Sequence, residues 1–181
     1  DVFMGNGVSE LILFSLSALL EPGDEVLIPS PDYPLWTAAT VLHGGKAVHY
    51  PCRPENAFIP DPEEIRSLVT PRTRAVVVIS PNNPTGAVYP LEVLEGIARI
   101  AEEHHLVVYS DEIYDQVLYD DAIHIPMATL VKKTLCATFG GLSKVYRACG
   151  FRVGWVSFSG EKGGAKDYIQ AFELLSSLRL C

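Results

Sequence analysis

The apolar run Val76-Val77-Val78-Ile79 constrains the fold of this 181-residue chain more than any other segment. Consecutive β-branched residues favour a strand, and a strand that is apolar on both faces must be covered on both of them. Further short apolar runs occur along the chain and are separated by longer helical patterns. This alternation is typical of an α/β fold whose mostly parallel sheet is connected by right-handed crossovers.

The predicted elements fill the chain from one end to the other, without an internal repeat or a low-complexity segment. We therefore expect one domain, with a mostly parallel seven-stranded sheet and helices on both of its faces. The strands are predicted at residues 2–4, 25–28, 47–50, 75–79, 106–109, 135–139 and 152–158, and helices at 9–20, 62–68, 90–105 and 166–180.

Composition excludes several classes of protein. The chain is 48% hydrophobic and 20% charged, which argues against intrinsic disorder. Its net charge is −8 and it has no basic block, so nucleic-acid binding is not expected. The longest apolar stretch, residues 11–20, is too short to span a bilayer. We expect no membrane association and a cytoplasmic location.

The cysteines and histidines show no spacing that is typical of a metal site, and no metal is predicted. We expect the thiols to be reduced and mostly buried, and the histidines to have surface or structural roles. The cysteines are Cys52, Cys136, Cys149 and Cys181, and the histidines are His43, His49, His104, His105 and His124.

Polar and glycine-rich loops follow the carboxyl ends of the predicted strands, where ligands bind in open parallel sheets. Together they bring glycines, an aromatic ring, an amide, a carboxylate and a lysine to one edge of the sheet. These loops are residues 5–10, 29–34, 80–86, 110–114 and 140–144.

The first of these loops, Gly5-Asn6-Gly7-Val8-Ser9-Glu10, is similar to a dinucleotide-binding fingerprint, but Glu10 replaces its third glycine. A tight turn at the start of a helix explains the pattern equally well. A glycine turn that opens a helix also favours an anion, because free N–H groups and the helix dipole point toward it. We therefore predict a phosphate site. A nicotinamide-dependent dehydrogenase is the least favoured function, because its fingerprint lacks the third glycine.

Charged residues stand at three of the strand ends. Lys144 follows glycines after the sixth predicted strand, and Arg152 opens the seventh. A guanidinium binds phosphate in a bidentate manner, and a lysine amine is a candidate nucleophile. Asp111 follows the fifth predicted strand, where it either caps the next turn or faces a ligand.

Three segments of the chain carry a resemblance to the class I and II aminotransferases, which are pyridoxal-phosphate enzymes of fold type I. The order and spacing of these segments agree over nearly the whole chain. Within that family, residues 5–12, 32–39 and 118–122 are most similar to bacterial alanine (glutamate–pyruvate) aminotransferases. The three segments are Asn82-Asn83-Pro84-Thr85-Gly86, Asp111-Glu112-Ile113-Tyr114, and Ser143-Lys144 followed by Gly150-Phe151-Arg152-Val153-Gly154.

The resemblance implies a role for each candidate site residue, with pyridoxal 5'-phosphate as the cofactor. Lys144 would bond to the cofactor aldehyde and later move a proton from the substrate Cα, and Asp111 would pair with the pyridine nitrogen. Tyr33 would stack on the ring, and Tyr114 would donate to the ring 3'-oxygen. Asn83 would contact that oxygen and the substrate carboxylate. The phosphate would be held by Gly7, Val8, Ser9, Ser143 and Arg152.

The implied activity is transamination between an amino acid, alanine or glutamate, and a 2-oxo acid. Two alternatives share the cofactor segments. One is another fold-type I activity, such as a β-lyase or a decarboxylase, and the other is the effector-sensing domain of a transcription regulator. The resemblance also implies a homodimer.

Residues 1–181 would form the large cofactor-binding domain. The family's N-terminal arm and its C-terminal small domain, which carries an arginine for the substrate carboxylate, have no counterpart in this sequence. We therefore expect a fragment with low or no activity by itself.

Three details accompany the resemblance. Arg147 stands where the family usually has a small residue, and it would add positive charge near the site or point to solvent. Trp36 is expected to pack in the helix after Tyr33 rather than to contact substrate. The peptide bonds that precede Pro31 and Pro84 are expected to be cis.

Overall fold

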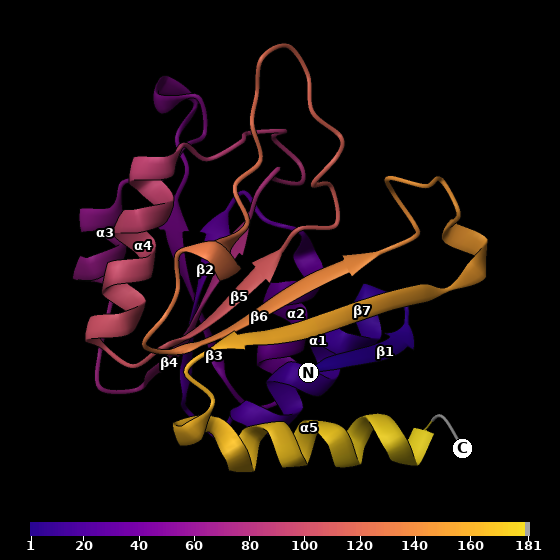
Figure 1. The fold of residues 1–181 in the computed structure, drawn as a ribbon. Helices are drawn as coiled ribbons and strands as arrows, with labels where there is room; N and C mark the ends of the chain where they lie inside the picture. Colours follow the sequence, from indigo (N-terminus) through magenta and orange to yellow (C-terminus); the bar gives the residue numbers. More distant parts are fainter. Residues whose placement is uncertain (180–181) are drawn as a thin grey trace.

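One seven-stranded sheet runs through the molecule, with the strand order β1-β7-β6-β5-β4-β2-β3 (Figure 1). The computed structural model describes residues 1–179. The predicted seven-stranded, mostly parallel sheet is confirmed. Its strands are β1 (Val2–Asn6), β2 (Glu25–Ser30), β3 (Lys46–Pro51), β4 (Thr73–Ile79), β5 (Val107–Asp111), β6 (Leu135–Gly141) and β7 (Val153–Gly160).

The strand β7 runs antiparallel to both of its neighbours, β1 and β6, whereas β2 to β6 pair in parallel. The connection from β6 to β7 is therefore a hairpin and not the right-handed crossover that we expected. Gly141 at the end of β6 pairs with Gly154 near the start of β7. The predicted strand 152–158 instead begins at Val153. Because β7 runs back, the loop that joins the two strands lies at the carboxyl edge of β6.

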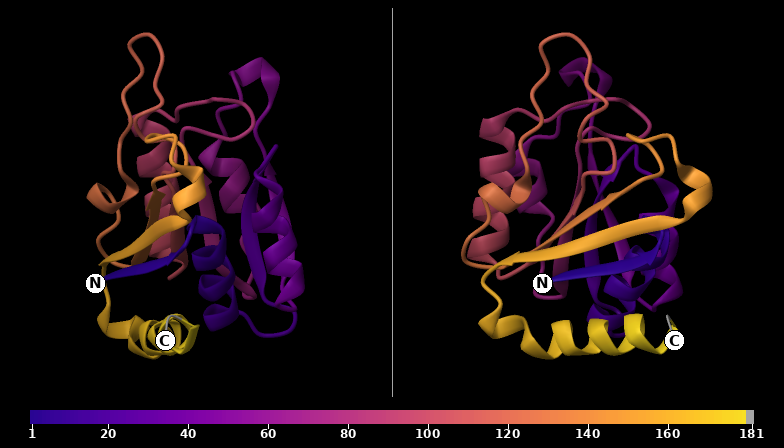
Figure 2. Two further views of the ribbon diagram at one scale, coloured as in Figure 1. Left: turned by 90° about the vertical axis from the view of Figure 1, so that its right-hand side faces the viewer. Right: turned by 45° about the vertical axis from the view of Figure 1, so that its right-hand side comes forward.

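Helices cover both faces of the sheet, as predicted (Figures 1 and 2). The helices α1 (Val8–Leu19), α2 (Pro34–Leu42) and α5 (Lys166–Arg179) contribute to one core, and α3 (Pro62–Ser67) and α4 (Leu91–Glu103) contribute to the other. Residue 180, the last of the predicted final helix, lies outside the described residues. Short 3-10 turns lie at Pro54–Asn56, Met127–Thr129, Cys149–Phe151 and Gly163–Ala165.

The strand β4 shows why the sheet must be covered on both faces. Val77 and Ile79 pack into the core beneath α1, α2 and α5, whereas Val76 and Val78 pack into the core beneath α3 and α4. This alternation follows from the two-residue period of a strand. Burial of each such side chain stabilises the fold by about 1.5–3 kcal/mol. The double-sided burial predicted for this run is confirmed.

The free cysteines divide as expected. Cys52 and Cys136 are buried, Cys149 is exposed, and Cys181 lies outside the described residues. Of the helices within residues 1–179, none has the length and apolar character needed to cross a membrane.

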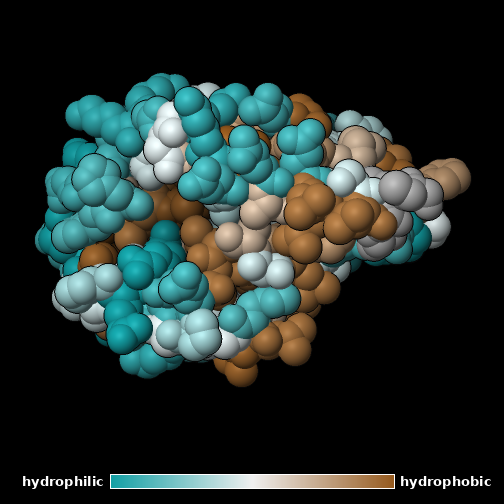
Figure 3. Space-filling model, turned by 90° about the horizontal axis from the view of Figure 1, so that it is seen from below, coloured by the Kyte–Doolittle hydropathy of each residue, from teal (hydrophilic) through white to brown (hydrophobic). Residues whose placement is uncertain are grey.

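The underside of the molecule carries exposed apolar side chains on α5 and β1. Leu174 and Leu178 of α5 and Val2 and Met4 of β1 are at least half exposed. Figure 3 shows apolar side chains gathered on the face where α5 lies. The loop that follows β5 projects from the opposite end of the molecule (Figures 1 and 2).

The N-terminus of α1 lies directly on β7, and glycine makes this approach possible. A Cβ atom at Gly154 would lie 2.5 Å from the Val8 nitrogen and 2.6 Å from the Gly7 carbonyl carbon. Both of these atoms belong to the backbone and cannot rotate away. Gly7 itself has φ 80°, a left-handed conformation that strains other residues. These two glycines therefore fix where the first turn of α1 begins.

We expect Gly154→Ala to lower the free energy of unfolding by about 1–3 kcal/mol, because the new methyl group must displace the first turn of α1. Gly150→Ala is the matched control, since a Cβ there meets no atom within 4 Å. It should change stability by no more than about 0.5 kcal/mol. Urea unfolding followed by circular dichroism measures both values. A Gly154→Ala protein as stable as the control would contradict the close approach.

Candidate functional site

A cavity of about 240 Å³ opens at the carboxyl edge of the sheet. Every predicted site residue except Gly7 lines it, and Gly7 adjoins the lining residue Val8. Loops that are far apart in the sequence therefore meet at one place, as the strand ends indicated. The lining residues are Val8, Ser9, Tyr33, Ile79, Asn83, Asp111, Ile113, Tyr114, Ser143, Lys144, Cys149 and Arg152. The sequence analysis did not identify Ile79, Ile113 or Cys149.

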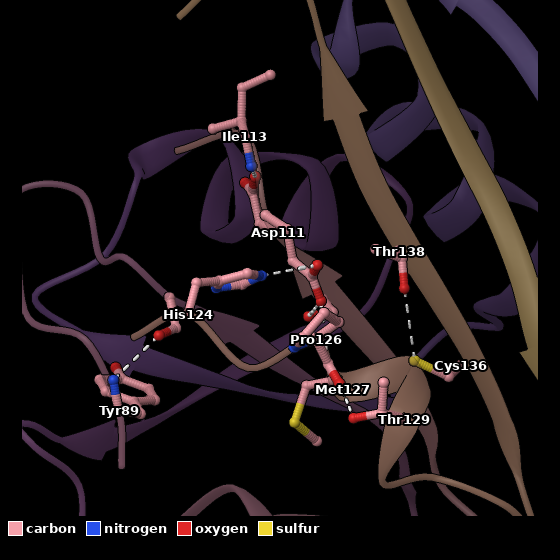
Figure 4. Close-up of polar contacts among 12 residues, drawn as sticks. Tyr89, Asp111, Ile113, His124, Pro126, Met127, Thr129, Cys136 and Thr138 are labelled. Carbon is pink, nitrogen blue, oxygen red and sulfur yellow. Dashed lines mark hydrogen bonds and ion pairs between the residues drawn. The ribbon is translucent and has the colours of Figure 1, made fainter. Parts of the chain in front are cut away.

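The floor of the cavity holds a buried carboxylate at the end of β5. The Asp111 side chain receives a hydrogen bond from Trp36 Nε1 at 3.1 Å on Oδ2. It receives a longer one from the Ile113 backbone N–H at 3.4 Å on Oδ1 (Figure 4). Burial raises the pKa of Asp111 to about 6, and the adjacent Glu112 carboxylate adds to this rise. The two donors oppose it. A carboxylate in such a setting is a strong partner for a cation inside the cavity.

The part of the cavity formed by α1 and Arg152 favours an anion. No side chain caps the N-terminus of α1 at Gly7, and the next residues, Val8 and Ser9, line the cavity. Arg152 adopts a left-handed backbone conformation with φ 54°. Its guanidinium donates to the Cys149 carbonyl at 2.8 Å, and it lies where a side chain at Gly7 would be. A helix N-terminus and a guanidinium together form a phosphate-binding arrangement.

The remaining lining residues come from the loops after β4, β5 and β6 and from the start of α2. Lys144 is exposed, and its Nζ lies 5.8 Å from the centre of the Tyr114 ring. Tyr33 stands at the N-cap of α2, and Asn83 is half-buried. An amine, a phenol and an amide thus stand in the cavity whose floor is Asp111.

The residue after Asp111 has a different environment, which the sequence analysis did not predict. Glu112 is buried and accepts hydrogen bonds from Ser110 Oγ at 2.8 Å, the Met127 backbone N–H at 3.1 Å and His124 Nε2 at 3.0 Å (Figure 4). These contacts fasten the two ends of the loop that carries Tyr114. His124 therefore has a structural role, as expected for the histidines. Within the described part of the chain, no group of His, Cys, Asp and Glu side chains is arranged to hold a metal ion.

The structure also tests the expectations for Trp36, Arg147 and the proline peptide bonds. Trp36 packs in α2, the helix after Tyr33, and is fully buried, but its hydrogen bond to Asp111 was not foreseen. Arg147 is exposed and lines an open groove beside the cavity. The peptide bonds before Pro31 and Pro84 are cis, as expected, and so is the bond before Pro81.

The environment of Asp111 predicts how its replacement affects the cofactor-free protein. Because its pKa is higher in the folded state than the ordinary value of 3.8, its ionisation costs stability as the pH rises from about 4 to 6. Asp111→Asn removes this cost. Its stability advantage over the unmodified protein should grow by about 2 kcal/mol between pH 4.5 and pH 7.5.

Urea unfolding at the two pH values measures the advantage. Asp121→Asn, which changes an exposed carboxylate, should show no such growth. An Asp111→Asn advantage that is equal at both pH values would contradict the assignment of a raised pKa.

Comparison with known proteins gives a family and several relatives. A sequence model of the family described as aminotransferase class I and II matches residues 1–179. The chain is 55% identical to the glutamate-pyruvate aminotransferase AlaA of Escherichia coli and 54% identical to an alanine aminotransferase of Mycobacterium tuberculosis. In both cases the match covers 100% of this chain, but only 45% and 42% of the respective relative.

A solved structure of an alanine aminotransferase from Pyrococcus furiosus superimposes with a TM-score of 0.96 at 41% sequence identity, covering 100% of this chain and 46% of that one. The chain thus spans less than half the length of these relatives. Since the family match covers almost all of the sequence, the chain belongs to the class I and II aminotransferases.

Proposed function

We propose that this chain is the cofactor-binding domain of a pyridoxal 5'-phosphate-dependent enzyme that transfers an amino group between alanine or glutamate and a 2-oxo acid. The observation that carries the proposal is the shared cavity: an amine, Lys144, a buried carboxylate, Asp111, and a guanidinium, Arg152, line the same space. The names of the relatives, glutamate-pyruvate and alanine aminotransferase, support the choice of substrates.

The donor set fits the proposed cofactor. A phosphate needs N–H, hydroxyl and cationic donors, and the first turn of α1, Ser143 and Arg152 offer them. A protonated pyridine nitrogen needs a desolvated carboxylate, which Asp111 offers. An aldehyde needs an amine, and Lys144 lines the cavity. When bound, pyridoxal phosphate supplies an electron-withdrawing ring that stabilises the negative charge that develops on the substrate Cα.

The chain's own residues then divide the work. Lys144 would hold the cofactor aldehyde through its amine, and the same amine, when free, would move a proton at the substrate Cα. Asp111 would face the ring nitrogen and favour its protonated form, and Tyr33 would pack on the face of the ring. Tyr114 and Asn83 would hold the 3'-oxygen, and Asn83 would also contact the substrate carboxylate.

The proposal includes the setting of this domain. Residues 1–181 are the large cofactor-binding domain, and the N-terminal arm and the small domain that complete the site lie outside them. We expect the complete protein to be a cytoplasmic homodimer. The free thiols Cys52, Cys136 and Cys149 support a reducing compartment.

The first test identifies the residue that bonds to the cofactor. After incubation with pyridoxal phosphate and reduction with borohydride, peptide mass spectrometry should find the label on Lys144. Lys144→Ala should remove the label and lower turnover of the complete protein by about a thousandfold or more. Lys133→Ala, which removes an exposed amine far from the cavity lining, should leave both unchanged. A label on another lysine would refute the assignment.

The second test separates transamination from the alternatives that share this cofactor. In the complete protein, with alanine as donor, pyruvate beyond one equivalent per cofactor should appear only when 2-oxoglutarate is added, and this further pyruvate should equal the glutamate formed. Ammonia release without an oxo acid would indicate a lyase, and carbon dioxide release a decarboxylase. Covalent cofactor binding without turnover of any amino acid would favour a sensing domain.

A further inference from the structure

The indole of Trp36 lies against the Asp111 carboxylate, and the proposed mechanism leaves it without a role. We propose that Trp36 is a positioning residue for the reaction: its indole N–H holds Asp111 in the orientation and the ionised form that the cofactor ring nitrogen requires. This inference rests on the proposed function, because it assigns a partner to one of its residues. Trp36 does not line the cavity itself, so it would act through Asp111.

Packing fixes the direction of the indole. Trp36 is fully buried, and its ring stacks on Tyr109 with centroids 5.6 Å apart and planes inclined by 29°. The Phe139 ring packs against it in an edge-to-face arrangement, with centroids 5.4 Å apart and an interplanar angle of 82°. Tyr109 lies two residues before Asp111 on β5, and Phe139 is the β6 residue that pairs with Asp111. The indole is thus held by the two strands that carry and flank the carboxylate, and its N–H is oriented before any ligand binds.

The chemistry of the indole makes it selective for the ionised acid. An indole N–H donates a hydrogen bond and cannot accept one, so it cannot satisfy a carboxyl proton on Oδ2. Of the two donors to Asp111, Trp36 is the closer, at 3.1 Å against 3.4 Å for the Ile113 N–H. Donation to the charged form opposes the effect of burial, which raises the pKa of Asp111 to about 6. Without the indole N–H, burial would be less opposed and the carboxyl would hold its proton to higher pH.

The same helical turn also places the aromatic ring expected to stack on the cofactor. Tyr33 is the N-cap of α2, and its carbonyl accepts the Trp36 backbone N–H at 3.1 Å. One turn of α2 therefore sets one wall of the cavity through Tyr33 and supports the floor through Trp36. Trp36 can therefore orient the Asp111 carboxylate from behind the cavity, without lining the cavity itself.

The experiment compares Trp36→Phe with Trp155→Phe, which replaces the other tryptophan of the sequence, on β7. Pyridoxal-phosphate affinity of the complete protein is measured between pH 5.5 and pH 8.5, with Asp111→Asn in parallel. Trp36→Phe should weaken binding about tenfold near pH 7, the size expected for a lost hydrogen bond to a charged group. The loss should shrink as the pH rises, because Asp111 then ionises without help. Trp155→Phe should follow the unmodified protein.

Two outcomes for Trp36→Phe overturn the inference. Unchanged affinity at every pH would show that the indole N–H does not matter. A loss of equal size at every pH would show that the ring acts only through packing. Asp111→Asn separates this failure from that of the proposed function: if it binds pyridoxal phosphate normally, the role of Asp111 itself is refuted.

A second measurement needs no change at Trp36 and covers the case in which Trp36→Phe does not fold. In the ¹⁵N-labelled cofactor-free protein, the Trp36 indole N–H resonance should shift with pH, with a midpoint of about 6, the pKa of Asp111. Asp111→Asn should abolish this titration, and the Trp155 indole resonance should not follow it. A Trp36 resonance that does not respond to pH between 4.5 and 7.5 would overturn the inference.

Discussion

The hydrogen bond between Trp36 and Asp111 is the interaction on which the proposed chemistry of the cavity depends, because it favours the ionised form of a buried carboxylate. Burial alone favours the neutral acid, and the indole N–H shifts the balance back toward the anion. The same cavity is lined by the first turn of α1 and by the Arg152 guanidinium. A ligand that carries both a cationic nitrogen and an anionic phosphate matches this separation of charge, and a ligand with only one of them does not.

The separation of charge depends in turn on the direction of β7. If a crossover had made β7 parallel to β6, its first residue would lie at the opposite edge of the sheet from Lys144. The hairpin instead holds Lys144 and Arg152 in one loop, and the pairing of Gly141 with Gly154 sets its base. The absence of a side chain at Gly154 then lets α1 start directly against β7, next to Arg152. The antiparallel direction of β7 therefore brings the Lys144 amine, the Arg152 guanidinium and the N-terminus of α1 to the same edge of the sheet.

The sequence contained enough information for the strands of the sheet and for most of the residues that line the cavity, but not for the contacts behind them. The run from Val76 to Ile79 identified a doubly covered strand, and polar loops after strands indicated where ligands bind. The direction of β7 was missed, although the short connection between the two predicted strands, which has no predicted helix, favours an antiparallel pair. The contact between Trp36 and Asp111 joins residues 75 positions apart and requires α2, β5 and β6 to be packed first. The roles of the lining residues came from the family resemblance, because their spacing alone does not assign a role to each of them.

The adjacent acids Asp111 and Glu112 illustrate how one strand end serves two purposes. Successive residues of an extended chain point to opposite faces, so one carboxylate meets Trp36 and the cavity while the next meets His124 and Met127 on the other side. Asp111 lines the cavity and accepts one hydrogen bond on each oxygen, whereas Glu112 accepts three donors. A buried carboxylate with satisfied oxygens anchors the loop of Tyr114. A buried carboxylate that lines a cavity, as Asp111 does, is a partner for a cation there. The two-residue period of a strand, which places the β4 side chains in both cores, thus also places Asp111 and Glu112 on opposite sides at the end of β5.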